Sequence, residues 1–493
     1  MIFTVLLSAV SVFTRPMERV STLDPAMCRS IYDARAVELV SETVLGIDYA
    51  ARPYRLTKAF CELPEVSEDG LVYVFKTVSG KGAGDVVRSL GRLADPSVVS
   101  PNAWIMRDVD TVRAPDDGTV EIRLKRRVHY FPWLMAMSAT AVVGKDGVTG
   151  EGSGPYRLKS WRKNHEMVFE IKDPPPHWRG FDVVRYIVVD DVSTQWLMFL
   201  RGEIDFLGEI SRDNWDSVIG PGGKLDERLV RDGVRLYSLP ALDVLYVGMN
   251  MRDKTLGTNL KLRQALNAAF DYPAWEKFYN GRITEANGPV PPGVEGRLET
   301  PAPYAYDLEK ARRLMVEAGY PGGRDRKTGR RLTLTLSIGR ASQESREAGE
   351  LMAAFYGKIG INLELHFMTW TAFVDAVSQG RVQLFRMGWV GDYPDAQNFL
   401  QLFYSANLSP GSNHSAYVNP AFDREYEAAL AASDADERNR RWAKCQEIVR
   451  EDCPWVFTHY NRSYSLVRPR VGNYIPSAFP YGQEVNYVSG DRQ

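Results

Sequence analysis

Apolar residues recur in two alternating spacings through the last third of the chain. In some stretches every second residue is apolar, which is typical of a strand with one buried face. In others the apolar residues are three or four positions apart, which is typical of a helix with one buried face. The pattern predicts strand, helix, strand, helix and strand over residues 332–338, 348–359, 363–367, 370–379 and 382–387.

This order favours parallel strands joined by helical crossovers. The third strand is predicted to end at Met387, and residues 388–395 follow it directly. In open α/β sheets, ligands bind in the crevice outside the carboxyl ends of the strands. The segment Gly388–Asp395 is therefore expected to lie at a ligand site.

The residue types around this segment suit a ligand that carries charges. Glycines allow a ligand to approach the backbone, which can pair with an extended peptide as an added strand. Asp392 is suited to an ammonium group, and the planar fork of Arg386 is suited to a carboxylate. The alternative is a tight turn followed by a helix capped by Asp395. We expect both to hold, with Asp395 as the cap and Asp392 facing the ligand.

Two other regions show clear patterns. Residues 183–189, 193–201 and 204–207 predict a strand, a helix and a strand in a β-α-β arrangement. Asp307 is placed to cap a helix, and Asp423–Arg450 predicts two charged surface helices.

Composition excludes several classes of function. The chain has 493 residues, enough for two or three domains, with a net charge of −1 that supports neither a nucleic-acid nor an anionic partner surface. No HExxH, GxSxG, Walker A or dinucleotide-binding motif is present, and no two histidines stand at metal-ligand spacing. We therefore expect no catalytic residue, metal or cofactor.

The cysteines and the N-terminus leave alternatives open. Cys28 with Cys61 and Cys445 with Cys453 are possible disulfides, and four free thiols are the alternative. Met1–Phe13 is apolar but too short to span a bilayer. It lacks the charge and cleavage site of a clear export signal, so a first strand is the favoured interpretation.

A set of short motifs in fixed order points to one family. Each is weak alone, but together they run along nearly the whole chain. They are Ser21–Ala26, Gly152–Leu158, Gly202–Asp205, Tyr246–Asn250, Leu262–Leu266, Gly288–Gly293, Tyr306–Ala311, Gly388–Phe399 and Asn419–Asp423. The chain resembles the family-5 extracytoplasmic solute-binding proteins of ABC importers, the dipeptide- and oligopeptide-binding group.

The resemblance implies an α/β, two-lobed periplasmic-binding-protein fold (Venus-flytrap, type II) with mixed sheets and an additional small domain in the N-terminal lobe. Domain I would comprise residues 1–45, 150–243 and 456–493, and domain III residues 244–455. Domain II, residues 46–149, would be reduced, because Lys76–Ala83 replaces a longer stretch.

The resemblance also implies a function. Such a receptor captures oligopeptides as its lobes close and delivers them to separate permease and ATPase subunits. It acts as a monomer outside the cytoplasm, associated with the membrane through the importer, and it is not an enzyme.

Site residues follow from the same resemblance. Asp392 would pair with the peptide amino terminus and Arg386 with a carboxylate. Trp370 and Trp389 would line side-chain pockets, and the backbone of Gly388 and Val390 would pair with the peptide. Tyr393 and Tyr460 complete the predicted set of ligand-binding residues.

Two alternatives stay open at this point. The same fold could serve an oligosaccharide or a nickel complex, with Trp370 and Trp389 stacking on sugar faces. An enzyme or a cytoplasmic regulator is the alternative from another class, and it would be distinguished by turnover of peptides rather than their retention.

Overall fold

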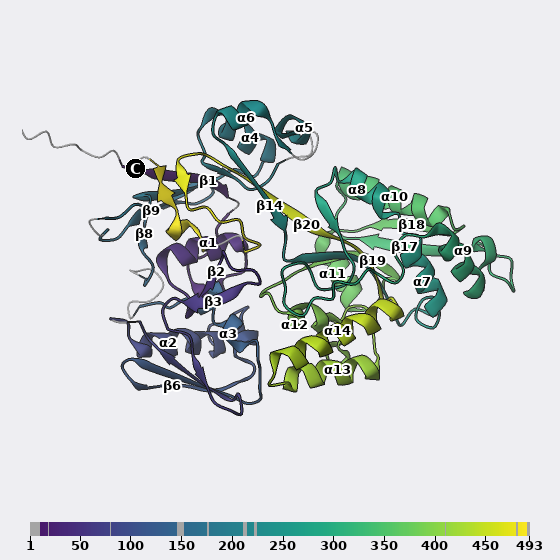
Figure 1. The fold of residues 1–493 in the computed structure, drawn as a ribbon, viewed down its shortest axis with the longest axis horizontal. Coiled ribbons are helices and arrows are strands. Elements are labelled where there is room, and N and C mark those ends of the chain that lie inside the picture. Colours follow the sequence, from purple (N-terminus) through teal and green to yellow (C-terminus); the bar gives the residue numbers. More distant parts are fainter. Residues whose placement is uncertain are drawn as a thin grey trace, which may run out of the picture. The chain divides into compact units, whose positions relative to one another are not determined.

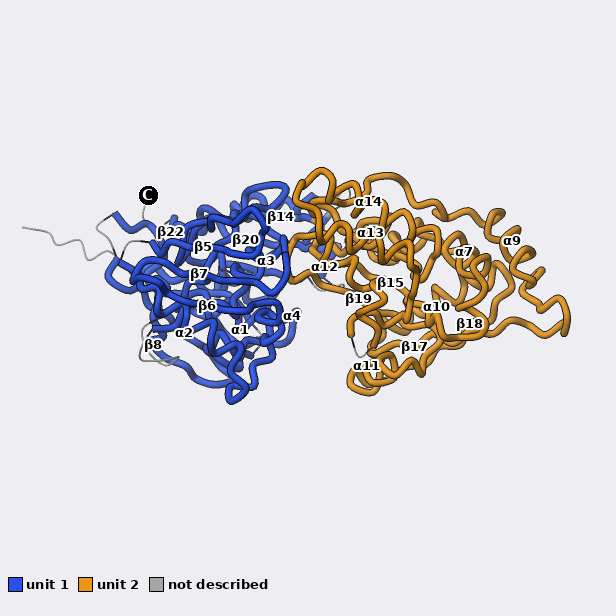
Figure 2. Tube along the Cα trace, turned by 90° about the horizontal axis from the view of Figure 1, so that it is seen from below, with its two compact units in different colours: residues 1–239, 463–493 blue, residues 240–462 orange. Residues whose placement is uncertain are grey.

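The chain divides into two compact units, drawn in two colours in Figure 2. Unit 1 comprises residues 1–239 and 463–493, and unit 2 comprises residues 240–462. The computed structural model describes residues 10–17, 19–78, 80–144, 152–174, 177–210, 214–220, 224–409, 411–479 and 482–490. The finer division into domains I, II and III stays a prediction.

Unit 1 contains several small sheets with short helices. Its helices are α1 (Ile31–Val40), α2 (Ala83–Ala94), α3 (Phe131–Leu134), α4 (Val192–Arg201), α5 (Trp215–Val218) and α6 (Glu227–Arg231). One four-stranded sheet has the order β1 (Val12–Met17), β10 (Val183–Val188), β9 (Glu166–Ile171) and β8 (Tyr156–Arg162). A second has the order β4 (Glu65–Val66), β5 (Val72–Lys76), β7 (Thr119–Leu124) and β6 (Val109–Asp116).

Short antiparallel pairs complete unit 1. They are β2 (Leu45–Asp48) with β3 (Arg55–Lys58), β12 (Ile219–Gly220) with β13 (Lys224–Leu225), and β21 (Val471–Gly472) with β22 (Val488–Ser489).

The β-α-β arrangement predicted for residues 183–207 is wrong. The strand β10 and the helix α4 form as expected, but β11 (Phe206–Leu207) does not join the sheet of β10. It pairs antiparallel with the end of β20 (Trp455–Val467), a strand that arrives from the other end of the chain. The apolar pattern of residues 183–207 cannot show that β11 pairs with a strand more than 200 residues away, because it reflects only nearby residues.

Unit 2 is built on the largest sheet of the structure, seen beside α8 to α11 in Figure 1. Its order is β11, β20, β15 (Asp243–Met249), β19 (Leu384–Val390), β17 (Thr333–Ile338) and β18 (Asn362–Phe367). Two further strands, β14 (Arg235–Pro240) and β16 (Ile283–Glu285), pair with β20. Of this sheet, β11, β14 up to Leu239 and β20 from Ser463 belong to unit 1. The helices are α7 (Leu260–Ala268), α8 (Tyr272–Phe278), α9 (Leu308–Glu317), α10 (Gln343–Gly357), α11 (Trp370–Ser378), α12 (Ala396–Leu400), α13 (Pro420–Ala431) and α14 (Ala435–Asp452).

The three strands predicted from the apolar pattern are confirmed as parallel neighbours. β17 pairs parallel with β18 on one side and with β19 on the other, so the order in the sheet is β18, β17, β19. The helices α10 and α11 connect them, as the spacing predicts.

The predicted end of the third strand is wrong. β19 continues three residues beyond Met387, to Val390. The reason is its antiparallel partner β15, which pairs with it as far as Asp243 opposite Val390. Gly388 and Val390 are therefore strand residues, and the loop begins at Gly391.

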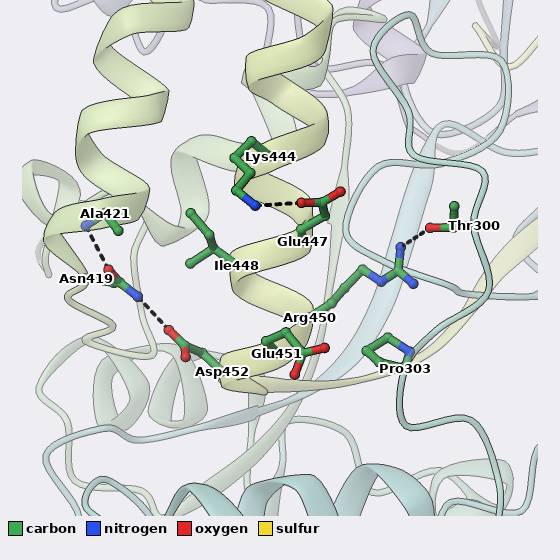
Figure 3. A pocket seen from close by; sticks show the side chains of 10 residues that line it. All are labelled: Thr300, Pro303, Asn419, Ala421, Lys444, Glu447, Ile448, Arg450, Glu451 and Asp452. Atoms are coloured by element: carbon green, nitrogen blue, oxygen red, sulfur yellow. Dashed lines mark hydrogen bonds and ion pairs between the residues drawn. The ribbon is translucent and has the colours of Figure 1, made fainter.

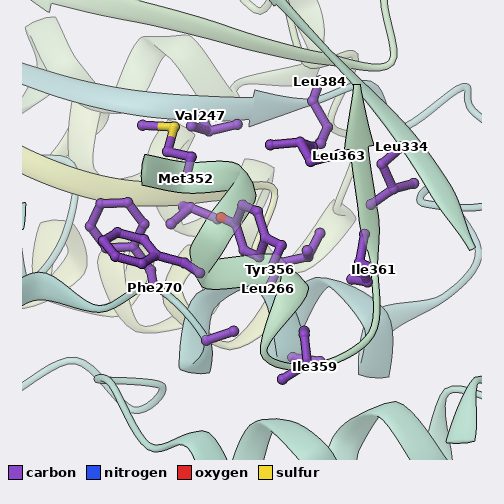
Figure 4. Packing of buried hydrophobic residues seen from close by; sticks show 14 of the residues in the cluster. Val247, Leu266, Phe270, Leu334, Met352, Tyr356, Ile359, Ile361, Leu363 and Leu384 are labelled. Atoms are coloured by element: carbon purple, nitrogen blue, oxygen red, sulfur yellow. The ribbon is translucent and has the colours of Figure 1, made fainter. Parts of the chain in front are cut away.

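Buried apolar side chains from the sheet and from α7 to α10 form one core (Figure 4). Leu334 and Leu336 of β17 and Met352 of α10 are at most 1% exposed. The predicted helix caps are confirmed: the Asp307 side chain accepts a hydrogen bond from Lys310 N, and that of Asp395 accepts one from Gln397 N.

All four cysteines are free thiols in the structure, so neither of the two possible disulfides is formed. Of the apolar stretch Met1–Phe13, residues 1–9 lie outside the described residues. The first strand begins at Val12 and so contains only the last two residues of that stretch.

We expect Met352→Ala to lower the free energy of unfolding of unit 2 by about 2–5 kcal/mol, because the fully buried side chain leaves a cavity between α10 and the sheet. Val316→Ala, at a position 45% exposed on α9, is the matched control and should change it by less than about 0.5 kcal/mol. Urea unfolding of both variants measures the difference, and equal losses would show that Met352 does not support the core.

Candidate ligand-binding site

A pocket of about 680 Å³ lies in unit 2 at the carboxyl end of β17, a volume typical of ligand sites. Its lining comes from the loop after β17, the first turn of α10, the start of α11, and strands β15, β19 and β20. Among the lining residues are Arg340, Glu344, Trp370, Arg386, Gly388 and His459. The pocket thus brings together three of the residues predicted to bind ligand: Trp370, Arg386 and Gly388.

The strand β19 is paired on one side only along its last residues. β17 pairs with it as far as Ile338 opposite Arg386, whereas β15 continues to its end at Val390. Among the described residues, no strand pairs with β19 on the β17 side beyond Arg386. This stretch is an open sheet edge beside the pocket, and Val390 is 71% exposed there.

Gly388 is a glycine for a packing reason as well. A Cβ atom at this position would lie 2.4 Å from Cδ1 of Leu245, which is closer than real contacts allow. Any larger residue would have to displace Leu245, a residue of β15 that lines the pocket. The close packing keeps this part of β19 free of a side chain.

Asp392 lies two residues beyond β19 and is half-buried. Among the described residues it bonds to Asn398: the Asp392 backbone N–H donates to Oδ1 at 3.3 Å, and Asn398 Nδ2 donates to the carboxylate at 3.4 Å. Burial raises the pKa of Asp392, and the bond from Asn398 lowers it by less. Within the described residues the carboxylate has no ion pair, so a cation from outside would stabilise it.

Arg386 is the corresponding cation in the pocket. Its Nη2 donates to the Tyr279 hydroxyl at 2.8 Å, and its guanidinium lies 5.8 Å from the ring centre of Trp275. In the part of the chain that the structure describes, no carboxylate forms an ion pair with Arg386 or with Arg340. Both can therefore take a carboxylate from a ligand.

His459 lines the pocket as a neutral side chain. Trp275 Nε1 donates to its Nδ1 at 3.1 Å, so the neutral ring carries its proton on Nε2. Burial and then the charge of Arg386 lower the pKa of His459 to about 3. His459 thus adds no positive charge beside Arg386 at neutral pH.

Asn461 of β20, which lines the pocket, is hydrogen-bonded to the neighbouring strand β15. Its backbone N–H and its Nδ2 donate to the two carboxylate oxygens of Asp243, at 2.9 and 2.7 Å. Asp243 is buried, which raises its pKa. The bonds connect β20 to the start of β15 at the level where β19 ends.

The other predicted site residues lie in different surroundings. Trp370 lines the pocket and is 61% exposed. Trp389 is half-buried, and its Nε1 donates to Asn398 Oδ1 at 2.9 Å. Tyr393 and Tyr460 are buried, and the Tyr460 hydroxyl donates to the Gly288 carbonyl at 2.8 Å. Neither tyrosine lines this pocket, and their roles stay predictions.

Several residues of the site were not found from the sequence. Asn398 is 1% exposed and holds both Trp389 and Asp392, although its sequence pattern is that of an ordinary first helical turn. Tyr279 directly follows α8 and His459 belongs to β20, and both lie near Arg386 only in the folded chain. The one signal in the sequence for Asn398 is a polar side chain next to the apolar pair Phe399 and Leu400 in a short helix.

A second pocket of unit 2, about 460 Å³, lies beside α14 (Figure 3). Its charged groups are bonded to other residues of the protein. Lys444 pairs with Glu447 at 2.9 Å, Asn419 donates to Asp452 at 2.7 Å, and Arg450 donates to a threonine hydroxyl. The first pocket differs because Arg340 and Arg386 there lack ion pairs within the described chain.

The described residues contain no group of three or more His, Cys, Asp and Glu side chains placed to hold a metal ion. They also contain no helix whose length and apolar character would allow it to cross a membrane.

Residues 55–410 match the family model described as bacterial extracellular solute-binding proteins, family 5 Middle. The chain therefore belongs to this family, and the predicted membership is confirmed. It is 25% identical to heme-binding protein A of Haemophilus influenzae over 470 residues, which cover 86% of this chain and 82% of that protein. It is 27% identical to the glutathione-binding protein GsiB of Escherichia coli K12 over 465 residues, which cover 88% and 86%.

Solved structures show the same fold. HbpA2 from Haemophilus parasuis has a TM-score of 0.82 at 23% identity, over 95% of this chain and 98% of that one. DppA from Helicobacter pylori, in complex with the peptide STSA, has a TM-score of 0.77 at 23% identity, over 98% of both chains. The predicted fold class, the mixed α/β fold of two-lobed periplasmic binding proteins, is confirmed.

The neutral state of His459 predicts a pH dependence of stability. Its native pKa lies below its ordinary value of 6.5, so the unfolded chain binds a proton that the native protein does not as the pH falls. The stability that the native protein gains from a neutral His459 is fully present above pH 6.5 and is lost progressively as the pH falls toward about 3. Between pH 7 and pH 5 the wild type should lose about 2 kcal/mol of unfolding free energy from this group.

His459→Gln keeps an acceptor for Trp275 Nε1 but does not titrate, so the variant should lose about 2 kcal/mol less over the same interval. His414, also buried with a lowered pKa, is common to both proteins and cancels in the comparison. Identical losses in urea titrations of both proteins would contradict a neutral, buried His459.

Proposed function

We propose that this family-5 protein is a receptor for oligopeptides, which it retains intact and delivers to an ABC-type importer. The observation that carries the proposal is the Asp392 carboxylate, half-buried at the end of an open sheet edge with no ion pair among the described residues. A buried carboxylate is costly without a cation, and a peptide amino terminus supplies one together with N–H donors.

The open edge of β19 supports an extended ligand. From Met387 to Val390 the strand is paired only with β15, so its other edge is available to a peptide backbone. A peptide added there gains main-chain hydrogen bonds that do not depend on its sequence. Binding of varied peptides is therefore expected from the geometry of the backbone.

The pocket beside this edge suits the rest of the ligand. Arg386 and Arg340 provide cations for a carboxylate, and Trp370 provides an exposed apolar face. Arg386 and Asp392 lie at different points along the edge, one positive and one negative. This arrangement matches the two oppositely charged ends of a short peptide.

The names of the relatives support a peptide ligand, but they do not identify a particular peptide. GsiB is named as a glutathione-binding protein and the DppA structure holds a peptide, whereas heme-binding protein A is named for heme. The exposed face of Trp370 also suits stacking on a sugar, so an oligosaccharide is the second candidate. A neutral sugar would leave Asp392 without a cation, which favours peptides.

The proposed site of action is outside the cytoplasm, with separate permease and ATPase subunits as partners and a monomeric receptor. The support is membership of a family of extracellular solute-binding proteins. Binding is expected without turnover, so peptides recovered from the protein should be intact.

The peptides that the wild type retains from a pool of short peptides serve as the probe. Asp392→Ala should weaken their binding by about 2–5 kcal/mol in calorimetry, because the ligand ammonium loses a partly buried ion-pair partner. N-acetylation of the same peptides should weaken binding to the wild type similarly and should have little further effect on Asp392→Ala.

The matched control is Glu364→Gln, which removes an exposed carboxylate of β18 and should leave the affinity unchanged. Unchanged affinity in Asp392→Ala, or equal binding of free and acetylated peptides, would contradict the assigned role of Asp392. Failure of the wild type to retain any peptide would overturn the proposed function.

A further inference from the structure

A basic hairpin lies between the short turn after α9 and the start of β17. Residues 324–331 contain five basic side chains and one acidic side chain, a net charge of +4 in a chain whose total is −1. All five basic side chains are exposed. They are Arg324, Arg326, Lys327, Arg330 and Arg331.

The single acid of the hairpin is used to build its turn. Asp325 Oδ1 accepts hydrogen bonds from the backbone N–H groups of Lys327 and Thr328, at 2.9 and 2.7 Å. These bonds keep the pKa of Asp325 below its ordinary value. Gly329 closes the turn with a φ of 68°. The carboxylate therefore holds the backbone in place.

Three of the arginines donate to backbone carbonyls: Arg324 to one inside the hairpin, and Arg326 and Arg331 to carbonyls outside it. Arg324 donates to Gly329 O, Arg331 to Gly360 O, and Arg326 to Val316 O near the carboxyl end of α9, each at 3.1 Å. The bond from Arg326 satisfies a carbonyl at a helix terminus. Each guanidinium keeps further N–H donors, because one bond uses only part of its fork.

Within the described chain none of the five cations forms an ion pair. Lys327 and Arg330, near the tip, make no side-chain hydrogen bond that supports the fold. The cluster thus differs from the charged pairs on other helices, such as Arg312 with Glu309 on α9. A set of cations without ion-pair partners attracts an anionic surface.

The composition of the hairpin indicates what kind of surface it fits. Between Arg324 and Arg331 there is no apolar side chain, whereas the centres of protein interfaces are rich in apolar and aromatic residues. An anionic lipid surface needs only charge and exposure, and each nearby Lys or Arg contributes to binding.

We propose that residues 324–331 bind the headgroups of an anionic phospholipid membrane. The hairpin would hold the protein weakly and reversibly at such a surface, independently of any ligand in the pocket. The binding is electrostatic, so it weakens as the Debye length falls from about 10 Å at 0.1 M salt to about 3 Å at 1 M.

The test is sedimentation of the full chain with phosphatidylcholine vesicles that contain or lack phosphatidylglycerol. The wild type should partition onto the vesicles with phosphatidylglycerol at low salt only. The double variant Lys327→Gln/Arg330→Gln should lose about 25-fold in partition coefficient, about fivefold for each cation. Its melting temperature and peptide affinity should match the wild type, because neither side chain supports the fold or the pocket.

The matched control is Arg424→Gln/Arg440→Gln, which removes two exposed cations from α13 and α14 and changes the net charge equally. It should keep the partition coefficient within about twofold, since these residues lie outside the proposed surface. Equal losses in both double variants, or equal binding of the wild type to both kinds of vesicle, would overturn the proposal. The proposal would also be overturned if Lys327→Gln/Arg330→Gln bound these vesicles normally but no longer bound the purified importer. The hairpin would then be a binding site for protein.

Discussion

The unequal pairing of β19 is the constraint on which the candidate site depends. β17 ends opposite Arg386, while β15 continues to Val390, so the last residues of β19 are held in strand conformation with one edge unpaired. An unpaired edge in solvent is normally a liability for a protein. Here it lies beside a pocket of about 680 Å³, and we propose that the edge binds ligand.

Charge placement follows from the same geometry. Arg386 stands at the last residue paired with β17, and Asp392 lies just beyond the end of β19. Each keeps its charge partly buried without an ion pair in the described chain, and Asn398 holds Asp392 only through long hydrogen bonds. His459 is neutral and so adds no positive charge next to Arg386. Such a site is complete only when a ligand with opposite charges occupies it.

The features that depend on nearby residues could be predicted from the sequence. The alternation of β17, the apolar face of α10 and the caps at Asp307 and Asp395 each involve residues within a few positions. The end of β19 and the partner of β11 could not be predicted, because β15 and β20 determine them from far away in the chain. Tyr279 and His459 were missed for the same reason, since both lie far from Arg386 in the chain. Asn398 is only six residues from Asp392, but a local pattern does not show that its side chain turns back toward that carboxylate.

Native mass spectrometry of the protein purified with its carried-over ligand would show whether Asp392 and the edge of β19 hold a peptide. We expect adducts with the masses of intact short peptides that carry a free amino terminus. These adducts should dissociate without cleavage, since the site holds the ligand through charge and backbone pairing. A carried-over sugar or heme, or fragments produced by turnover, would contradict this expectation.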